Sequence, residues 1–176
     1  FRSIPQIEIA LPNGGAWKQA AAICNYVNNL SEELVTPEEL MGDADQSIAA
    51  LGRMLKEYRD ILAEGNLMDF SSIQIEAYHL LRENEEILDE LRSQITHLMV
   101  DEYQDTNFIQ EQLVFLLAGD RKNICVVGDD DQGLYRFRGA TIRNILEFPQ
   151  KFADGECRIV PLVVNYRSNS DIVDFY

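Results

Sequence analysis

The order of apolar and polar positions predicts a helical first part of the chain. From about residue 16 to residue 64, apolar residues recur at three- and four-residue spacing, which is the period of one helix face. Two stripes carry this pattern: Trp17, Ala20, Cys24 and Val27 in the first, and Ile48, Leu51, Leu55, Tyr58 and Leu62 in the second. Each stripe predicts an amphipathic helix.

Start and stop signals further define where the helices of this part begin and end. In the run Thr36-Pro37-Glu38-Glu39, the threonine can cap a helix and the proline suits its first position. The glutamate three residues after the threonine completes a capping box. Gly65-Asn66 is typical of a helix end.

Beyond Asp69 the pattern changes to alternating helices and strands. Short apolar runs that end abruptly in acidic or polar residues predict buried parallel strands, and the segments between them predict helices. The expected helices are 71–81, 84–92, 108–117 and 141–148, and the expected strands are 95–100, 124–127 and 158–164. This order is typical of a parallel α/β sheet, in which ligands gather at the carboxyl ends of the strands.

Composition places the chain among globular proteins. Its 176 residues are 46% hydrophobic and 26% charged, enough for one domain, or one domain plus a small appendage. No apolar run approaches a membrane span, and no leader for export opens the chain. The start at Phe1-Arg2-Ser3, without Met, leads us to expect a segment of a longer protein. Cys24, Cys125 and Cys157 form no CxxC pair, so we expect buried free thiols and a cytoplasmic location.

Charge limits how the chain can contact nucleic acid. The net charge of −15 argues against a protein that coats DNA, because nonspecific affinity comes mainly from Lys and Arg on phosphates. Residues 124–176 hold 6 basic and 8 acidic side chains, a net of −2, and are the least acidic part. Arg136, Arg138 and Arg143 stand there with no acid among them, so we expect any DNA contact in this stretch.

Three short motifs carry candidate chemistry, and the first is Val100-Asp101-Glu102-Tyr103-Gln104-Asp105. Paired acids directly after a buried strand are what a nucleoside triphosphatase uses to hold Mg²⁺ and to deprotonate the attacking water. An isolated Asp-Glu pair is also common in a solvated acidic turn, and this alternative stays open for the motif alone.

The second motif is VVGDDDQGLYRFRGA, over residues 126–140. Its end interleaves two aromatic residues, Tyr135 and Phe137, with two arginines, Arg136 and Arg138. Rings that stack on bases and guanidinium groups that hold phosphates make a surface for single-stranded DNA. Alternatively, the two rings belong to the core and the arginines to the surface.

The third motif is Val164-Asn165-Tyr166-Arg167-Ser168, at the end of the third expected strand. An arginine there can reach a phosphate, and the adjacent tyrosine can stack on a nucleobase. A surface salt bridge is the alternative for the arginine.

In this order and at this spacing, VDEYQDTN, VVGDDDQGLYRFRGA and NYRS resemble motifs II, III and IV of UvrD/Rep-type superfamily 1 DNA helicases. The resemblance covers about residues 67–176. Met68-Asp69-Phe70 is similar to the family's signature at the return from an inserted helical subdomain, although Ser71-Ser72 stands where an acid is often found. The resemblance implies that residues 1–66 belong to that subdomain. It implies that residues 67–176 form the C-terminal part of the first RecA-like domain, of the P-loop NTPase type.

The resemblance also implies roles for single residues. Asp101 would position Mg²⁺, and Glu102 would be the catalytic base. Gln132 would sense the γ-phosphate of ATP and couple it to DNA. Tyr166 would stack on adenine, and Arg167 would contact the γ-phosphate.

For DNA, the resemblance implies contacts from Tyr135, Phe137 and Arg138, with Phe137 where many relatives have Trp. The implied partners are ATP, single-stranded DNA and duplex junctions. His79 and His97 have no acid or Cys at ligand spacing, so we expect both to be structural.

One part of the family's site is missing from this sequence. No G-x-x-x-x-G-K-[ST] phosphate loop occurs, and Gly14-Gly15 is followed by Ala-Trp-Lys. We therefore expect the chain to hold half of an ATPase site. Two alternatives stay open: a noncatalytic interaction module that retains the fold, and a subunit of a helicase–nuclease.

Overall fold

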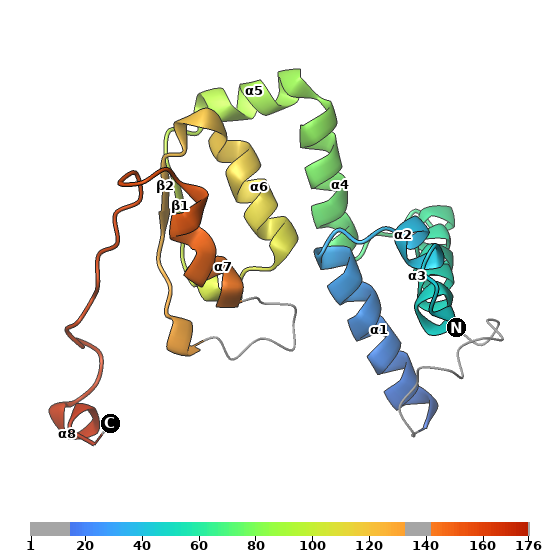
Figure 1. The fold of residues 1–176 in the computed structure, drawn as a ribbon, viewed down its shortest axis with the longest axis horizontal. Coiled ribbons are helices and arrows are strands. Elements are labelled where there is room, and N and C mark those ends of the chain that lie inside the picture. The colour runs from blue at the N-terminus through green and yellow to red at the C-terminus, as the bar shows by residue number, and fades with distance from the viewer. Residues whose placement is uncertain (1–14, 133–141, 176) are drawn as a thin grey trace. The chain divides into compact units, whose positions relative to one another are not determined.

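The computed structural model in Figure 1 describes residues 15–132 and 142–175. Two compact units divide at Ile145 and Leu146, and each is described by itself. The strands are β1 (Leu98–Val100) and β2 (Ile124–Val126), and the helices are α1 (Ala16–Glu32), α2 (Pro37–Met41), α3 (Gln46–Glu64), α4 (Phe70–Glu83), α5 (Glu85–Gln94), α6 (Phe108–Ala118), α7 (Ile142–Glu147) and α8 (Ser170–Val173). Among the described residues no helix is long and apolar enough to cross a membrane.

The first three helices share a small apolar core. Ile23 and Val27 of α1 pack with Met54 and Leu55 of α3, and all four are buried. The predicted stripe of α3 is confirmed at its centre, because Leu55 has no exposed surface. The predicted stripe of α1 is wrong at its start: Trp17 is 89% exposed, because the buried face of α1 is the one that carries Ile23 and Val27.

The predicted capping box is present at the start of α2. The Thr36 backbone N–H donates to Glu39 Oε2 at 2.8 Å, and the Glu39 N–H donates to Thr36 Oγ1 at 3.3 Å. Pro37 occupies the first turn, where its missing N–H costs nothing. The predicted stop is also confirmed, since α3 ends at Glu64 and Gly65 caps it.

Asp69 joins α3 to α4 through hydrogen bonds. One carboxylate oxygen, Oδ1, caps α4 by accepting the Ser72 N–H at 2.6 Å, and the other accepts the Tyr58 hydroxyl of α3 at 2.6 Å. Burial alone would raise the pKa of Asp69, but the bonds from Ser72 and Tyr58 outweigh it and lower that pKa. Ser71 is buried, and its hydroxyl donates to Glu32 Oε1 of α1 at 3.5 Å. Ser71 therefore links α4 to α1, whereas Ser72 takes part in the cap of α4.

The predicted parallel pairing is confirmed for two strands. β1 and β2 run parallel with Leu98 opposite Ile124 and Val100 opposite Val126 (Figure 1). The expectation that both faces are buried is wrong, because Met99 is 78% exposed. The chain is thus a helix-rich α/β protein with a small parallel sheet.

The third predicted strand is absent. Residues 158–164 are described, and they form no strand. A β-strand needs a neighbour for its backbone hydrogen bonds, and the described part of the second unit contains no strand that could supply them. The apolar side chains of this run are consequently exposed, from 58% at Val164 to 85% at Val163.

The thiols are free, as expected, but their predicted burial is wrong. Cys24 and Cys125 are exposed and Cys157 is partly buried. Cys24 lies on α1, and Cys125 neighbours Met99 on the uncovered face of the sheet.

We expect Asp69→Ala to cost about 2 kcal/mol of unfolding free energy at pH 7, since it removes a helix cap and a bond from Tyr58. Asp45, which caps α3 through Ser47, is the matched control, and Asp45→Ala should cost about 1 kcal/mol. A lowered native pKa stabilises the fold above the unfolded pKa of about 4, so the Asp69 effect should shrink as pH falls below that value. Urea unfolding at pH 7 and pH 3 measures both. An Asp69 effect that equals the control and does not change with pH would contradict this account.

Candidate functional site

The first two motifs meet at the carboxyl ends of β1 and β2. The pairing continues beyond the strands, because the Val127 N–H donates to the Val100 carbonyl at 2.8 Å and the Tyr103 N–H donates to the Val127 carbonyl at 2.9 Å. Asp101 and Glu102 follow β1 directly, and Gly128 and Asp129 follow the end of β2. The sheet register therefore sets the two motifs beside each other.

The turn after β1 displays two neighbouring carboxylates. Glu102 has φ +51° and ψ +43°, in the left-handed region that costs a residue with a side chain about 1–2 kcal/mol. Asp101 Oδ1 accepts the Glu102 N–H at 2.9 Å, and the Glu102 carbonyl accepts the Asp105 N–H at 2.9 Å. Both acidic side chains are exposed. They are available to a ligand, and the backbone that carries them is strained.

Tyr103 anchors this turn in the protein interior. Its side chain is fully buried, and its hydroxyl donates to Glu111 Oε1 of α6 at 2.9 Å. Burial, together with the neighbouring Glu111 carboxylate, raises the pKa of Tyr103 far above its ordinary value. Tyr103 thus remains a neutral donor, and it fixes the turn to α6.

Gln104 connects the first motif to the second. Its side chain is 1% exposed. Its Nε2 donates to Glu102 Oε2 at 2.7 Å, and its Oε1 accepts the Asp129 N–H at 3.0 Å. Both ends of one buried amide are therefore used, one on each motif.

Asp129 carries the connection on to Gln132. Asp129 Oδ2 accepts a hydrogen bond from Gln132 Nε2 at 2.7 Å, and its Oδ1 accepts the Asp131 N–H at 3.0 Å. Residues Asp130–Gln132 form a single 3₁₀ turn. A series of hydrogen bonds thus connects Glu102 through Gln104 and Asp129 to Gln132, and its middle bond is donated by the Asp129 backbone N–H.

Gly128 leaves the space that Gln104 occupies. A Cβ at this position would lie 2.6 Å from Gln104 Oε1 and 2.6 Å from Ile145 Cδ1. Contacts that short do not occur, so any side chain here would displace the Gln104 amide. Only glycine is compatible with this arrangement.

The far side of the first motif is held by a second buried amide. Asn144 Nδ2 lies within 3.2–3.3 Å of the Thr106 carbonyl, the Thr106 hydroxyl and the Asn107 carbonyl. Asn107 itself caps α6 by accepting the Gln110 N–H at 2.9 Å. The motif is therefore fixed at both ends, independently of the bonds that Gln104 makes.

Sequence reasoning gave no role to Gln104, Gly128, Glu111 or Asn144. A signal for Gln104 was present, since an uncharged polar side chain two residues after a catalytic acid candidate invites a hydrogen bond. Glu111 and Asn144 act through contacts between elements that no local pattern encodes.

The third motif belongs to the second unit. Asn165 Oδ1 accepts the N–H groups of Arg167 at 2.9 Å and Ser168 at 3.0 Å, which forms a tight turn. Tyr166 is 92% exposed and Arg167 is exposed. Because this unit is described by itself, the implied contact of Arg167 with the γ-phosphate stays a prediction. Tyr135, Phe137 and Arg138, the expected DNA contacts, lie outside the described residues.

The carboxylates suit a metal ion that is shared with a nucleotide. Among the described residues, no cluster of three or more His, Cys, Asp or Glu side chains could hold a metal by itself. Mg²⁺ commonly uses only one or two protein carboxylates and completes its shell with water and phosphate oxygens. The exposed carboxylate of Asp101, held by its own turn, fits that kind of site.

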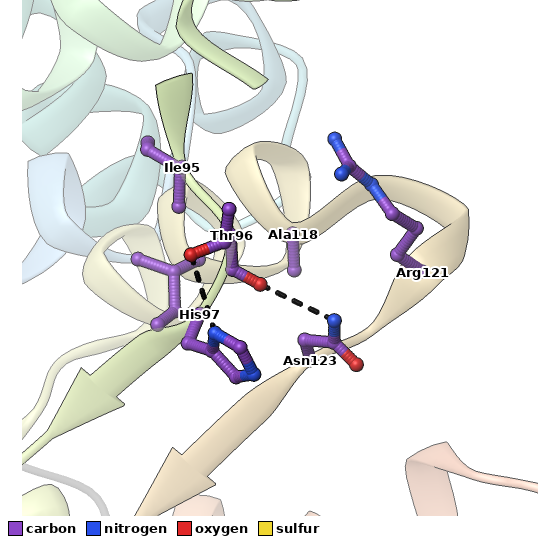
Figure 2. Close-up of a pocket in the computed structure, with 7 residues that line it drawn as sticks. Ile95, Thr96, His97, Ala118, Arg121 and Asn123 are labelled. Carbon is purple, nitrogen blue, oxygen red and sulfur yellow. Dashed lines mark hydrogen bonds between the residues drawn. The ribbon is translucent and has the colours of Figure 1, made fainter. Parts of the chain in front are cut away.

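A small cavity lies at the opposite, amino ends of the strands and is shown in Figure 2. His97 Nδ1 lies 3.2 Å from Thr96 Oγ1, and Asn123 Nδ2 donates to the Thr96 carbonyl at 3.2 Å. The cavity has a volume of about 10 Å³, room for one water molecule. His97 is exposed, and its expected structural role stays a prediction.

Comparison with known proteins places this arrangement in a family. Residues 8–153 match the UvrD/REP helicase N-terminal domain. The chain is 37% identical over 162 residues to the ATP-dependent DNA helicase UvrD1 of Mycobacterium tuberculosis, covering 86% of this chain and 21% of that protein. It is 38% identical over 149 residues to the ATP-dependent DNA helicase PcrA of Staphylococcus epidermidis (84% and 20%), and 34% identical over 148 residues to DNA helicase II of Escherichia coli (84% and 20%).

In α/β proteins with parallel sheets, ligands bind beyond the carboxyl ends of the strands, where the acidic turns of this chain lie. The chain belongs to the UvrD/REP helicase family, as its motifs indicated. It spans about a fifth of the length of the curated relatives that it matches.

The strained backbone at Glu102 makes a stability prediction. Glycine pays no steric cost at φ +51°, so Glu102→Gly should be more stable than Glu102→Ala by about 1 kcal/mol. Both variants lose the same side-chain bond, so their difference isolates the backbone. Glu90, in the interior of α5, is the control, and there glycine should be less stable than alanine by about 1 kcal/mol. Chemical unfolding measures the free energy of unfolding of the four variants. If glycine were less stable than alanine at both positions, the backbone of Glu102 would not be strained.

Proposed function

We propose that this chain contributes to the ATPase site of a DNA helicase that couples ATP hydrolysis to movement along single-stranded DNA and to unwinding at duplex junctions. The observation that carries the proposal is the hydrogen-bonded chain from Glu102 through Gln104 and Asp129 to Gln132. It joins a candidate catalytic carboxylate to the segment that leads toward the candidate DNA-contacting residues. The names of the relatives, which are ATP-dependent DNA helicases, support the same function. They do not favour a noncatalytic module or a nuclease subunit.

The proposed roles follow from the chemistry of each side chain. Glu102 takes the proton of the attacking water, because its carboxylate is exposed and oriented by Gln104. Asp101 holds Mg²⁺, which when bound neutralises charge on the phosphates. Gln132 senses the γ-phosphate of ATP and couples it to DNA. Tyr166 stacks on adenine, and Arg167 contacts the γ-phosphate.

We assign the parts of the chain to a larger motor in the same way. Residues 1–66 belong to an inserted helical subdomain, and residues 67–176 belong to the C-terminal part of a RecA-like domain. The uncovered sheet face at Met99 and the exposed run from Ile159 to Val164 support this assignment, because both have the apolar character of strands that pair and pack with further strands. The function of such a motor suits a cytoplasmic protein.

The first test of this function is Glu102→Gln in the full-length helicase that carries this sequence. The amide keeps the size of the side chain but cannot act as a base, so ATP hydrolysis should fall ~10²–10⁴-fold. Binding of ATP and of DNA should change little. The 176-residue chain alone, which lacks the phosphate loop, should release no phosphate from Mg·ATP. A phosphate-release assay with single-stranded DNA compares the wild-type helicase, the Glu102→Gln helicase and the 176-residue chain. An active Glu102→Gln helicase would overturn the assignment.

The second test concerns DNA. In the same helicase, Phe137→Ala should weaken binding to single-stranded DNA by about 1–3 kcal/mol, the usual value of one stacked base. Arg138→Ala should lower the salt dependence of binding, because one phosphate contact is lost. Arg53, on α3 and outside the three motifs, supplies the control variant Arg53→Ala, which should leave the salt dependence unchanged. Fluorescence anisotropy over a salt series measures the affinity for single-stranded DNA and its salt dependence. If Phe137→Ala and Arg138→Ala bound DNA like the wild type, these residues would not belong to the DNA site.

A further inference from the structure

We propose that Gln104 is a positioning residue that orients the Glu102 carboxylate and makes the rate of hydrolysis depend on the Asp129–Gln132 turn. This inference rests on the proposed function, in which Glu102 is the base. Gln104 touches neither substrate nor DNA in the proposal. It acts only through its two bonded neighbours, Glu102 and Asp129.

The first argument is the match between the Gln104 amide and its partners. The amide nitrogen faces an acceptor, Glu102 Oε2 at 2.7 Å, and the amide oxygen faces a donor, the Asp129 N–H at 3.0 Å. A carboxylate at this position would lack the donor, and an apolar side chain would lack both groups. Asparagine is one methylene shorter. Glutamine alone meets both requirements at this length.

The second argument is burial. Glu102 is exposed, so burial does not fix the direction of its side chain, and its carboxylate accepts a hydrogen bond from Gln104. Gln104 is 1% exposed, and its amide occupies the space left by Gly128, where a Cβ would lie 2.6 Å from Gln104 Oε1. A hydrogen bond from a rigid, buried donor to a charged group is among the stronger ones in proteins. The buried Gln104 amide therefore orients the exposed Glu102 carboxylate.

The third argument is continuity with the second motif. The Asp129 backbone is held by Gln104, and the Asp129 carboxylate holds the Gln132 amide at 2.7 Å. A shift of the Asp130–Gln132 turn therefore moves Asp129 and, through it, the Gln104 amide that orients the Glu102 carboxylate. Tyr135, a candidate DNA contact, is three residues further along the sequence. DNA binding can reach the base by this route without a direct contact.

The test measures ATP hydrolysis, with and without single-stranded DNA, in the full-length helicase that carries this sequence. Gln104→Met has a similar size and makes neither bond. We expect its kcat with DNA to fall on the order of 10-fold or more, the value of about one hydrogen bond to a charged group, while KM for ATP changes less than about 3-fold. The stimulation of hydrolysis by DNA should fall with kcat. Wild-type kcat and DNA stimulation in Gln104→Met would overturn the inference.

A matched control separates positioning from folding. Asn144 of α7 is also a buried amide that contacts the first motif, but it bonds Thr106 and Asn107 and not Glu102. Asn144→Leu should lower the melting temperature and keep kcat within about 3-fold of wild type. An equal loss of kcat in both variants would show that the role of Gln104 is only structural. If Gln104→Met does not fold, Gly128→Ala displaces the same amide and should give the same loss of kcat, and wild-type kcat in Gly128→Ala would refute the inference.

Two further arms complete the design. Combining Gln104→Met with Gln132→Leu should reduce kcat little beyond the larger single effect, because both break one chain of bonds, and additive losses would refute the link. Glu102→Gln tests the underlying function separately. If Glu102→Gln hydrolyses ATP normally, the proposed function fails. If Glu102→Gln is inactive and Gln104→Met is normal, only the positioning role fails.

Discussion

The parallel register of β1 and β2 is the constraint on which the site depends. It places Val100 opposite Val126 and continues through the bond from the Val127 N–H to the Val100 carbonyl. Because both strands end at the same edge, two segments that lie 25 residues apart come within reach of one glutamine side chain. A slip of one residue would turn every strand side chain to the opposite face and break that reach.

A second constraint is that the carboxylates of Asp101 and Glu102 must be exposed in order to reach a ligand. A group that must meet a ligand cannot be held by burial, so its neighbours are buried instead. Tyr103 and Gln104, the two residues after Glu102, have almost no exposed surface, and each bonds a different element. These anchors offset the left-handed backbone at Glu102, a cost of about 1–2 kcal/mol that the fold tolerates at the site where it is used.

Local signals made most helices predictable, whereas tertiary partners decided the remainder. The capping box at Thr36 and the stop at Gly65 depend only on neighbouring residues, and both were predicted correctly. Trp17 was placed on the wrong face because its helical period fits a buried stripe, while the partners of α1 contact the face of Ile23. The third strand was predicted from an apolar run, but a strand also needs a paired neighbour. The acids of the site could be predicted from their motif. For Gln104, the spacing to Glu102 could have indicated their hydrogen bond, but the bond with the Asp129 N–H could not be predicted, because no local pattern encodes that contact.

The most direct test of this account is the rate of hydrogen exchange at the Asp129 backbone amide in the 176-residue chain. In the wild type, Asp129 and Val127 should both be protected, since their N–H groups donate to Gln104 Oε1 and to the Val100 carbonyl. Gln104→Met should speed exchange at Asp129 by about 10-fold or more, the value of one hydrogen bond, and leave Val127 protected by the sheet. Equal exchange at Asp129 in both proteins, with Val127 protected, would contradict the claim that Gln104 joins the two motifs.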